Sequence, residues 1–96
     1  MRTGYIKPEF FKDDELCELS PLARILFEGL CCLADDGGKL EYRTKRIKAE
    51  ILPYDDCDIE ELLLSLEPKF IYRNGNYIKI MDFAKFQNPE VEEGDE

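Results

Sequence analysis

The chain has 96 residues, of which 44% are hydrophobic, so it can build one domain with a modest core but not two. It holds no apolar run long enough to cross a bilayer and no histidine. This argues against a membrane-spanning helix and removes the commonest acid–base catalyst. Five of the 22 acidic residues lie in residues 90–96, so this short segment supplies more than half of the formal net charge of -9.

The first predicted elements are an N-terminal arm and a long helix. Residues 4–11 place aromatic side chains around Pro8, which predicts an extended arm packed on the body of the domain, and residues 13–19 predict one short helical turn. Ser20 and Pro21 predict a helix start, because serine caps free backbone N–H groups and proline loses no hydrogen bond at the first helical position. The apolar residues expected to form its core face are Leu22, Ile25, Leu26, Gly29, Leu30 and Leu33.

A short strand and two further helices follow. Residues 39–42 predict a single edge strand. Thr44 predicts the cap of a helix that ends near Leu52, and Asp58 predicts the cap of a third helix, which Pro68 closes. The apolar positions of this third helix, Ile59, Leu62, Leu63 and Leu66, fall at helical spacing.

Residues 70–80 predict a β-hairpin around the dipeptide Asn74-Gly75, because asparagine and glycine both accept the positive φ of a tight turn. With these two residues at the turn centre, Tyr72 pairs with Tyr77 and Ile71 pairs with Ile78. The residues expected to share the face toward the helices are Ile71, Ile78 and Ile80. Phe83 and Phe86 then predict a short packed extension.

The order helix, short strand, helix, helix and hairpin predicts an α+β fold of the winged helix-turn-helix type, a three-helix bundle with a small antiparallel β-sheet. We expect this domain to comprise residues 1–89, with its wing hairpin at about 70–80. Residues 90–96 cannot bury apolar surface, so we expect a disordered acidic tail there.

Several blocks of the sequence together resemble one protein family. They are Tyr5-Ile6-Lys7-Pro8-Glu9-Phe10-Phe11, Leu19-Ser20-Pro21-Leu22-Ala23-Arg24, Leu33-Ala34-Asp35, Lys45-Arg46-Ile47-Lys48-Ala49-Glu50, Pro53-Tyr54-Asp55-Asp56 and Phe86-Gln87-Asn88-Pro89. They are similar to the N-terminal winged-helix domain of phage and prophage replication proteins of the replisome-organiser type. The resemblance implies a non-catalytic module of phage DNA metabolism in the bacterial cytoplasm, acting through DNA contacts, self-association or contacts to a loader. This chain departs from the family after residue 89, where the family has a longer downstream region and this sequence has only a few, mainly acidic residues.

The leading candidate contact surface is basic. Arg43, Lys45, Arg46 and Lys48 place four positive charges within six residues, and Arg73 and Lys79 add two more on the hairpin. Such a cluster attracts phosphate groups or an acidic protein patch, although solvated helix faces also carry lysine and arginine. The leading interpretation is a module that binds a nucleic acid or a protein through these residues in DNA replication or genome handling.

The alternative contact surface is acidic. Asp55, Asp56, Asp58, Glu60 and Glu61 surround the start of the third helix, which would enter the major groove in the usual docking, so phosphates would repel it. An array of carboxylates can instead occupy a site built for DNA. This predicts a DNA mimic that inhibits a host defence complex, of the anti-CRISPR or anti-restriction kind. Helix capping and solvation explain the same residues more simply.

No pattern in the sequence indicates catalysis or metal binding. Cys17, Cys31, Cys32 and Cys57 lack the CxxC spacing of a zinc site, so we expect them to be small, buried or half-buried apolar side chains. The sequence contains no P-loop, GxSxG or HExxH motif. We therefore expect a non-enzymatic protein without a cofactor, whose partner is a replication protein, a defence protein or nucleic acid. Homo-oligomerisation stays open.

Overall fold

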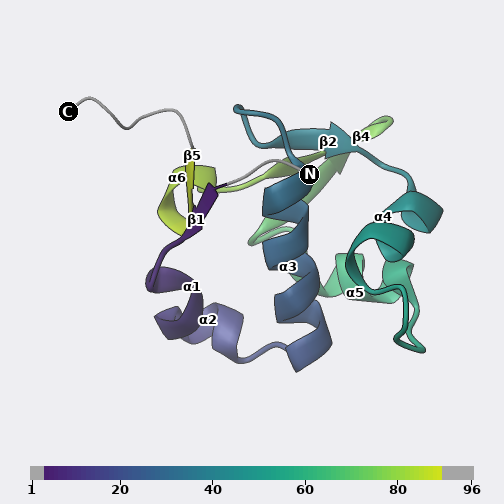
Figure 1. Ribbon diagram of the computed structural model, residues 1–96, viewed down its shortest axis with the longest axis horizontal. Coiled ribbons are helices and arrows are strands. Elements are labelled where there is room, and N and C mark those ends of the chain that lie inside the picture. The colour runs from purple at the N-terminus through teal and green to yellow at the C-terminus, as the bar shows by residue number, and fades with distance from the viewer. Residues whose placement is uncertain (1–3, 90–96) are drawn as a thin grey trace.

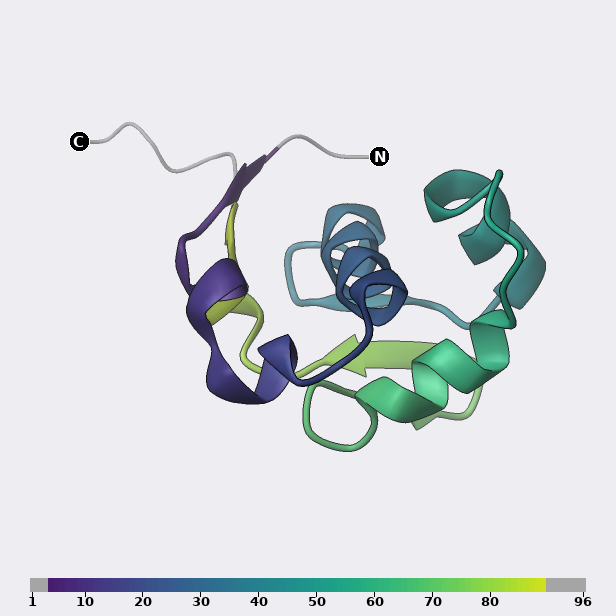
Figure 2. The ribbon, with the colours of Figure 1, turned by 90° about the horizontal axis from the view of Figure 1, so that it is seen from below.

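In the computed structural model, which describes residues 4–89, the long helix α3 (Pro21–Leu33) lies at the centre of a small α+β domain (Figure 1). The short helices α1 (Glu9–Lys12) and α2 (Asp14–Cys17) lie on one side of it. The helices α4 (Thr44–Ile51) and α5 (Ile59–Leu66) lie on the other side, and a three-stranded antiparallel sheet lies against α3 (Figure 2).

Helix α3 begins where the sequence predicts, but its buried face is rotated. The Ser20 Oγ accepts a hydrogen bond from the backbone N–H of Ala23 at 3.2 Å, which confirms the cap. Leu26 and Leu30 are fully buried as expected, whereas Ile25 is 51% exposed. The other buried residues of the helix are Ala23, Phe27 and Cys31. The predicted core face was therefore wrong at Ile25, and the buried face is shifted toward Phe27 and Cys31.

Helices α4 and α5 test the two predicted caps. Thr44 is the first helical residue and Arg43 is the N-cap, without a side-chain hydrogen bond, so the capping role predicted for Thr44 was wrong. Asp58 is confirmed as the cap of α5, since its Oδ1 accepts hydrogen bonds from the N–H groups of Glu60 and Glu61 at 3.0 and 3.3 Å. The backbone of Glu60 and Glu61 is therefore fixed next to Asp58 in the first turn of α5.

The three-stranded sheet has the order β2-β4-β3 and comprises β2 (Lys39–Glu41), β4 (Tyr77–Ile80) and β3 (Ile71–Asn74). β2 is an edge strand, as predicted. The hairpin register was wrong: Tyr72 pairs with Lys79 and Ile71 with Ile80, around a turn of Gly75 and Asn76. Gly75 has φ +64°, as the first central residue of a type II′ turn requires. The register differs by two residues, an even number, so the three predicted isoleucines are still buried.

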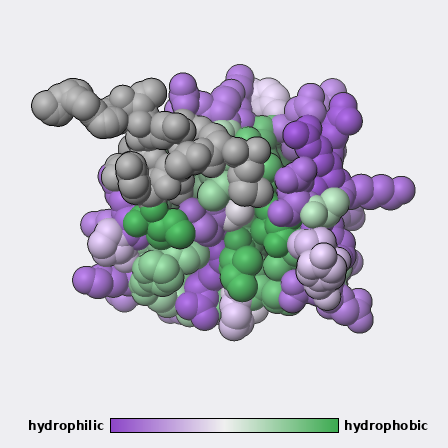
Figure 3. Space-filling view, in the orientation of Figure 1, coloured by the Kyte–Doolittle hydropathy of each residue, from purple (hydrophilic) through white to green (hydrophobic). Residues whose placement is uncertain are grey.

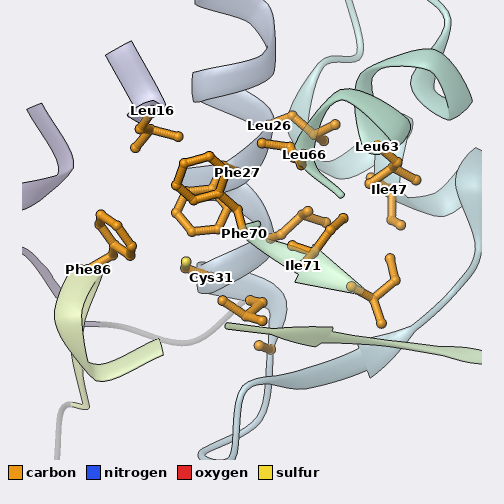
Figure 4. Close-up of a cluster of buried hydrophobic side chains, with 14 of the residues drawn as sticks. Leu16, Leu26, Phe27, Cys31, Ile47, Leu63, Leu66, Phe70, Ile71 and Phe86 are labelled. Carbon is orange, nitrogen blue, oxygen red and sulfur yellow. The ribbon is translucent and has the colours of Figure 1, made fainter. Parts of the chain in front are cut away.

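The two ends of the described chain lie side by side. β1 (Gly4–Ile6) pairs antiparallel with β5 (Gln87–Pro89), which follows the short helix α6 (Phe83–Phe86). This second sheet was not predicted. The core joins the C-terminal end to α3, because the ring of Phe27 packs against Phe86 of α6 at 5.2 Å, and against Phe70 at 5.5 Å, between centroids (Figure 4).

Within residues 4–89, no helix is long and apolar enough to cross a membrane. The acidic tail predicted for residues 90–96 lies outside the described residues. The four cysteines are free thiols, of which Cys31 is buried and Cys32 and Cys57 are half-buried. Cys17 is exposed and its thiol donates to the Phe11 carbonyl at 3.1 Å, so the burial predicted for Cys17 was wrong.

Candidate partner-binding surface

The basic cluster of α4 divides between two grooves. Lys45 and Lys48 line a groove of about 820 Å³ between α4 and the start of α5, which we name the α4–α5 groove. Arg43 and Arg46 line a separate groove of about 210 Å³ beside β2. The division follows from helical geometry, since residues three apart lie on one face and neighbouring residues point about 100° apart. The four charges therefore do not form one continuous basic patch.

Two of these four side chains are bound within the domain. The Lys48 Nζ donates to the Leu52 carbonyl at 3.0 Å, at the C-terminal end of α4, where the same carbonyl also accepts from the Asp55 N–H at 3.4 Å. The Arg43 Nε lies 3.1 Å from the Glu41 carboxylate. Lys45 and Arg46 are exposed and make no hydrogen bond or ion pair with any residue in the described range. These two side chains are the ones that are free to contact a partner.

The two hairpin residues of the predicted basic surface lie elsewhere. The Arg73 guanidinium stacks 3.7 Å above the ring of Tyr42, and its Nε donates to the Gly75 carbonyl at 3.2 Å. The Lys79 Nζ donates to the Gly37 carbonyl at 2.9 Å. Arg73 pairs with Ile78 on the strand, so it lies on the opposite face of the sheet from Lys79. The structure therefore does not join Arg73 and Lys79 into one surface with α4.

The acidic residues, in contrast, converge. Four of the five predicted acids, Asp56, Asp58, Glu60 and Glu61, line the α4–α5 groove together with Lys45 and Lys48. Asp55 is exposed and does not line the groove. The convergence has a local cause, because the Asp58 cap fixes the turn that carries Asp56 and places Glu60 and Glu61 in the first turn of α5. Most of the acidic surface and two residues of the basic surface thus meet in one groove.

In the α4–α5 groove, Lys48 and Asp58 are already hydrogen-bonded within the domain, whereas the exposed side chains of Lys45, Asp56, Glu60 and Glu61 can contact a partner. No ion pair in the described part of the chain joins Lys45 or Lys48 to the four carboxylates. Side chains from both sides surround Cys57, which is half-buried, and Ile59, which is buried. No group of three or more cysteine, aspartate or glutamate side chains in residues 4–89 is placed to hold a metal ion. The arrangement can bind a surface that carries mainly positive charge with one negative group.

A second groove was not predicted. It holds about 400 Å³ between the N-terminal arm, α3 and α4, and we name it the arm trough. Its lining includes the apolar side chains Ile6, Phe11, Ile25 and Ile51, with the carboxylates of Glu28 and Glu50. Figure 3 shows two hydrophobic areas on this face, one over the N-terminal segment and one over α3. The signal in the sequence was Glu28, a charged residue next to the apolar stripe of a core helix.

Burial shapes the electrostatics of the arm trough. Loss of solvent raises the pKa of Glu28 to about 7, against a weaker opposing effect of the Cys32 thiol, whose sulfur lies 3.8 Å from the carboxylate. The Glu28 Oε1 is buried and makes no hydrogen bond with any described residue. Burial also raises the pKa of the neighbouring Cys31 thiol, which makes it a poor nucleophile.

No protein-family model, no curated protein and no solved structure matches this chain. The α4–α5 groove and the arm trough are the features of the molecule from which a function can be inferred.

Proposed function

We propose that this chain is a non-enzymatic winged-helix interaction module of phage-type genome handling in the bacterial cytoplasm, and that it binds a protein through the α4–α5 groove. The order α3, β2, α4, α5, β3, β4 and the strand order β2-β4-β3 support the winged-helix assignment. The resemblance of the sequence blocks to phage replication proteins supports the link to genome handling.

The observation that carries the proposal is the meeting of four carboxylates and two lysines in the α4–α5 groove. Complementary charges across a protein interface increase the rate of encounter and fix the register of the two partners. A groove with both signs selects a partner with the reverse arrangement more strictly than a groove of one sign, because a wrong partner brings like charges together.

The same groove is a poor site for duplex DNA. DNA carries one negative charge per about 1.7 Å of its axis, so a backbone placed near Lys45 would also approach the carboxylates of Asp56 and Glu60. Arg73 and Lys79 are bound within the domain and lie on opposite faces of the sheet, so they do not extend a phosphate track from α4. The geometry favours a protein partner over nucleic acid.

Convergence of the acids also supports a second candidate function, the inhibition of a host nucleic-acid-binding complex by occupation of its basic site. Four carboxylates along one groove offer such a site a DNA-like array. The two functions differ in the role of Lys45. A register-fixing interface needs it, whereas an inhibitor of a basic site would bind more tightly without it.

Capture of proteins from a bacterial host lysate tests the proposal with the double variant Asp56→Lys/Glu60→Lys. We expect wild-type protein to retain a discrete partner and this variant to lose it, with an affinity at least about 100-fold weaker, because like charges then face each other across the interface. The matched control is Asp14→Lys/Glu18→Lys, which makes the same charge change at two exposed positions, one in α2 and one directly after it, and should retain the partner.

Capture of the same proteins by wild type and by Asp56→Lys/Glu60→Lys would contradict the proposal. Fluorescence anisotropy with labelled duplex and single-stranded DNA gives a second contradiction. Salt-sensitive DNA binding that Lys45→Glu and Arg46→Glu both weaken would return the basic cluster to the leading role.

A further inference from the structure

The arm trough gathers apolar side chains that a folded domain normally buries. Phe11 is 65% exposed, Ile25 is 51% exposed and Ile6 is 50% exposed, and all three line this one trough. Single exposed apolar residues are common on protein surfaces, but a contiguous apolar patch marks an interaction site. Burial of these side chains by a partner would be favourable, because it removes apolar surface from water.

The packing of α3 against α4 forms the far wall of the trough. A Cβ atom added at Gly29 would lie 2.5 Å from the side chain of Ile51, so only glycine lets α4 approach this closely. Ile51 is thereby held against α3 at Gly29, and it lines the trough together with Phe11 of the arm. The walls of the trough come from three separate parts of the fold, namely the N-terminal arm, α3 and α4.

The charges in the trough indicate what covers it. Glu28 and Glu50 are its only charged lining residues within residues 4–89, and both are acidic. The Glu28 Oε1 is buried without a hydrogen bond, and so is the Nε of Arg24, one helical turn earlier, so these two atoms do not satisfy each other. Positive charge brought by a partner would favour the ionised form of Glu28 and would also be attracted by Glu50.

Among the candidate occupants, the charge pattern favours one. A second copy of this chain would bring its formal net charge of -9 to a trough that already holds two carboxylates, and like charges repel. Half or more of Phe11, Ile25 and Ile6 stays exposed, so the trough is open along its length, as a helix-binding groove is. An apolar helix face with a nearby lysine or arginine fits both features.

We propose that the arm trough docks an amphipathic helix of a partner protein, with the apolar face of that helix on the exposed side chains of the trough and a lysine or arginine beside Glu28. This site shares no lining residue with the α4–α5 groove, so it is a second contact surface, independent of the proposed function.

Synthetic peptides test this inference on the full chain by fluorescence anisotropy. The probes are an amphipathic leucine–lysine peptide, the same design with glutamate in place of lysine, and a serine–lysine peptide of equal charge without an apolar face. We expect the leucine–lysine peptide to bind, and the other two to bind at least about tenfold more weakly, since each lacks one half of the recognition.

Variants locate the binding. Phe11→Ser and Glu28→Gln should each weaken the leucine–lysine peptide about tenfold. Leu64→Ser is the matched control, because Leu64 is also 65% exposed but lies on α5, outside the trough, and it should leave binding unchanged. Thermal melts of all variants show whether each one is folded.

Three results would overturn the inference. One is equal binding of the leucine–lysine peptide to wild type and Phe11→Ser, which would place the contact elsewhere. Another is equal binding of the glutamate peptide, which would remove the role of Glu28. The third is a concentration-dependent dimer of the wild-type chain in sedimentation that Phe11→Ser abolishes, which would make a second copy the occupant.

Discussion

The α4–α5 groove and the arm trough share a wall helix, α4, yet they offer opposite chemistry. The first is lined by four carboxylates and two lysines that make no ion pair with one another in the described chain. The second is lined mainly by apolar side chains, with two carboxylates, of which that of Glu28 is half-buried. Exposed charges give binding that depends on salt, whereas apolar burial gives binding that is less sensitive to salt. One small domain can therefore hold two contacts that respond to different conditions.

The largest expected effect comes from Gly29, because it holds α4 against α3 and so supports both regions. In Gly29→Ala, the new Cβ would clash with Ile51, and we expect a loss of about 1–3 kcal/mol of unfolding free energy, measured by urea denaturation. Gly37→Ala is the matched control, since its Cβ would meet only the Asp35 side chain at 3.5 Å. If Gly29→Ala and Gly37→Ala had equal unfolding free energies, the contact between α3 and α4 at Gly29 would not be tight.

A smaller effect distinguishes the trough from the charged groove by its pH dependence. The folded-state pKa of Glu28 is about 7, above its ordinary value of 4.5, so the ionised form is disfavoured in the fold. The contribution of neutral Glu28 to the free energy of unfolding is therefore complete below about pH 4.5, and it is lost as the pH rises through about 7. Glu28→Gln should remove this loss and raise stability at alkaline pH relative to wild type.

We expect this gain to be ~1 kcal/mol or less above pH 7, because partial exposure of the carboxylate reduces it, and to vanish in acid. Thermal melts across the pH range measure it. Glu50→Gln, which removes the other carboxylate of the trough, controls for the loss of one charge. A stability difference between Glu28→Gln and wild type that does not change with pH would refute the assigned environment.

The fold was predictable from local signals wherever one residue type decides the geometry. Ser20 and Asp58 have side chains that cap a helix, and the hairpin needs a glycine in its turn. The buried face of α3 was harder, because Phe27 and Cys31 are as apolar as Ile25, so two overlapping stripes fit the same periodicity. Tertiary packing with Phe70 and Phe86 decides between them.

The candidate site was predictable in its parts but not in its assembly. The sequence shows a basic cluster and an acidic cluster that are about ten residues apart, and it does not show that Lys45 and Asp56 line one groove. Glu28 was a sequence signal for the arm trough, but the shape of the trough could not be predicted, since it depends on the pairing of β1 with β5 and on the exposure of Phe11. Both features arise from contacts between segments that are distant in the sequence.

One measurement tests most directly whether the α4–α5 groove is the contact surface. Lys45 and Arg46 are adjacent in α4, carry the same positive charge, and are exposed without side-chain partners within the described chain, but only Lys45 lines this groove. The affinity of the captured host partner should fall about tenfold or more for Lys45→Glu and stay nearly unchanged for Arg46→Glu. An equal loss for both variants, or a loss for Arg46→Glu alone, would contradict the account.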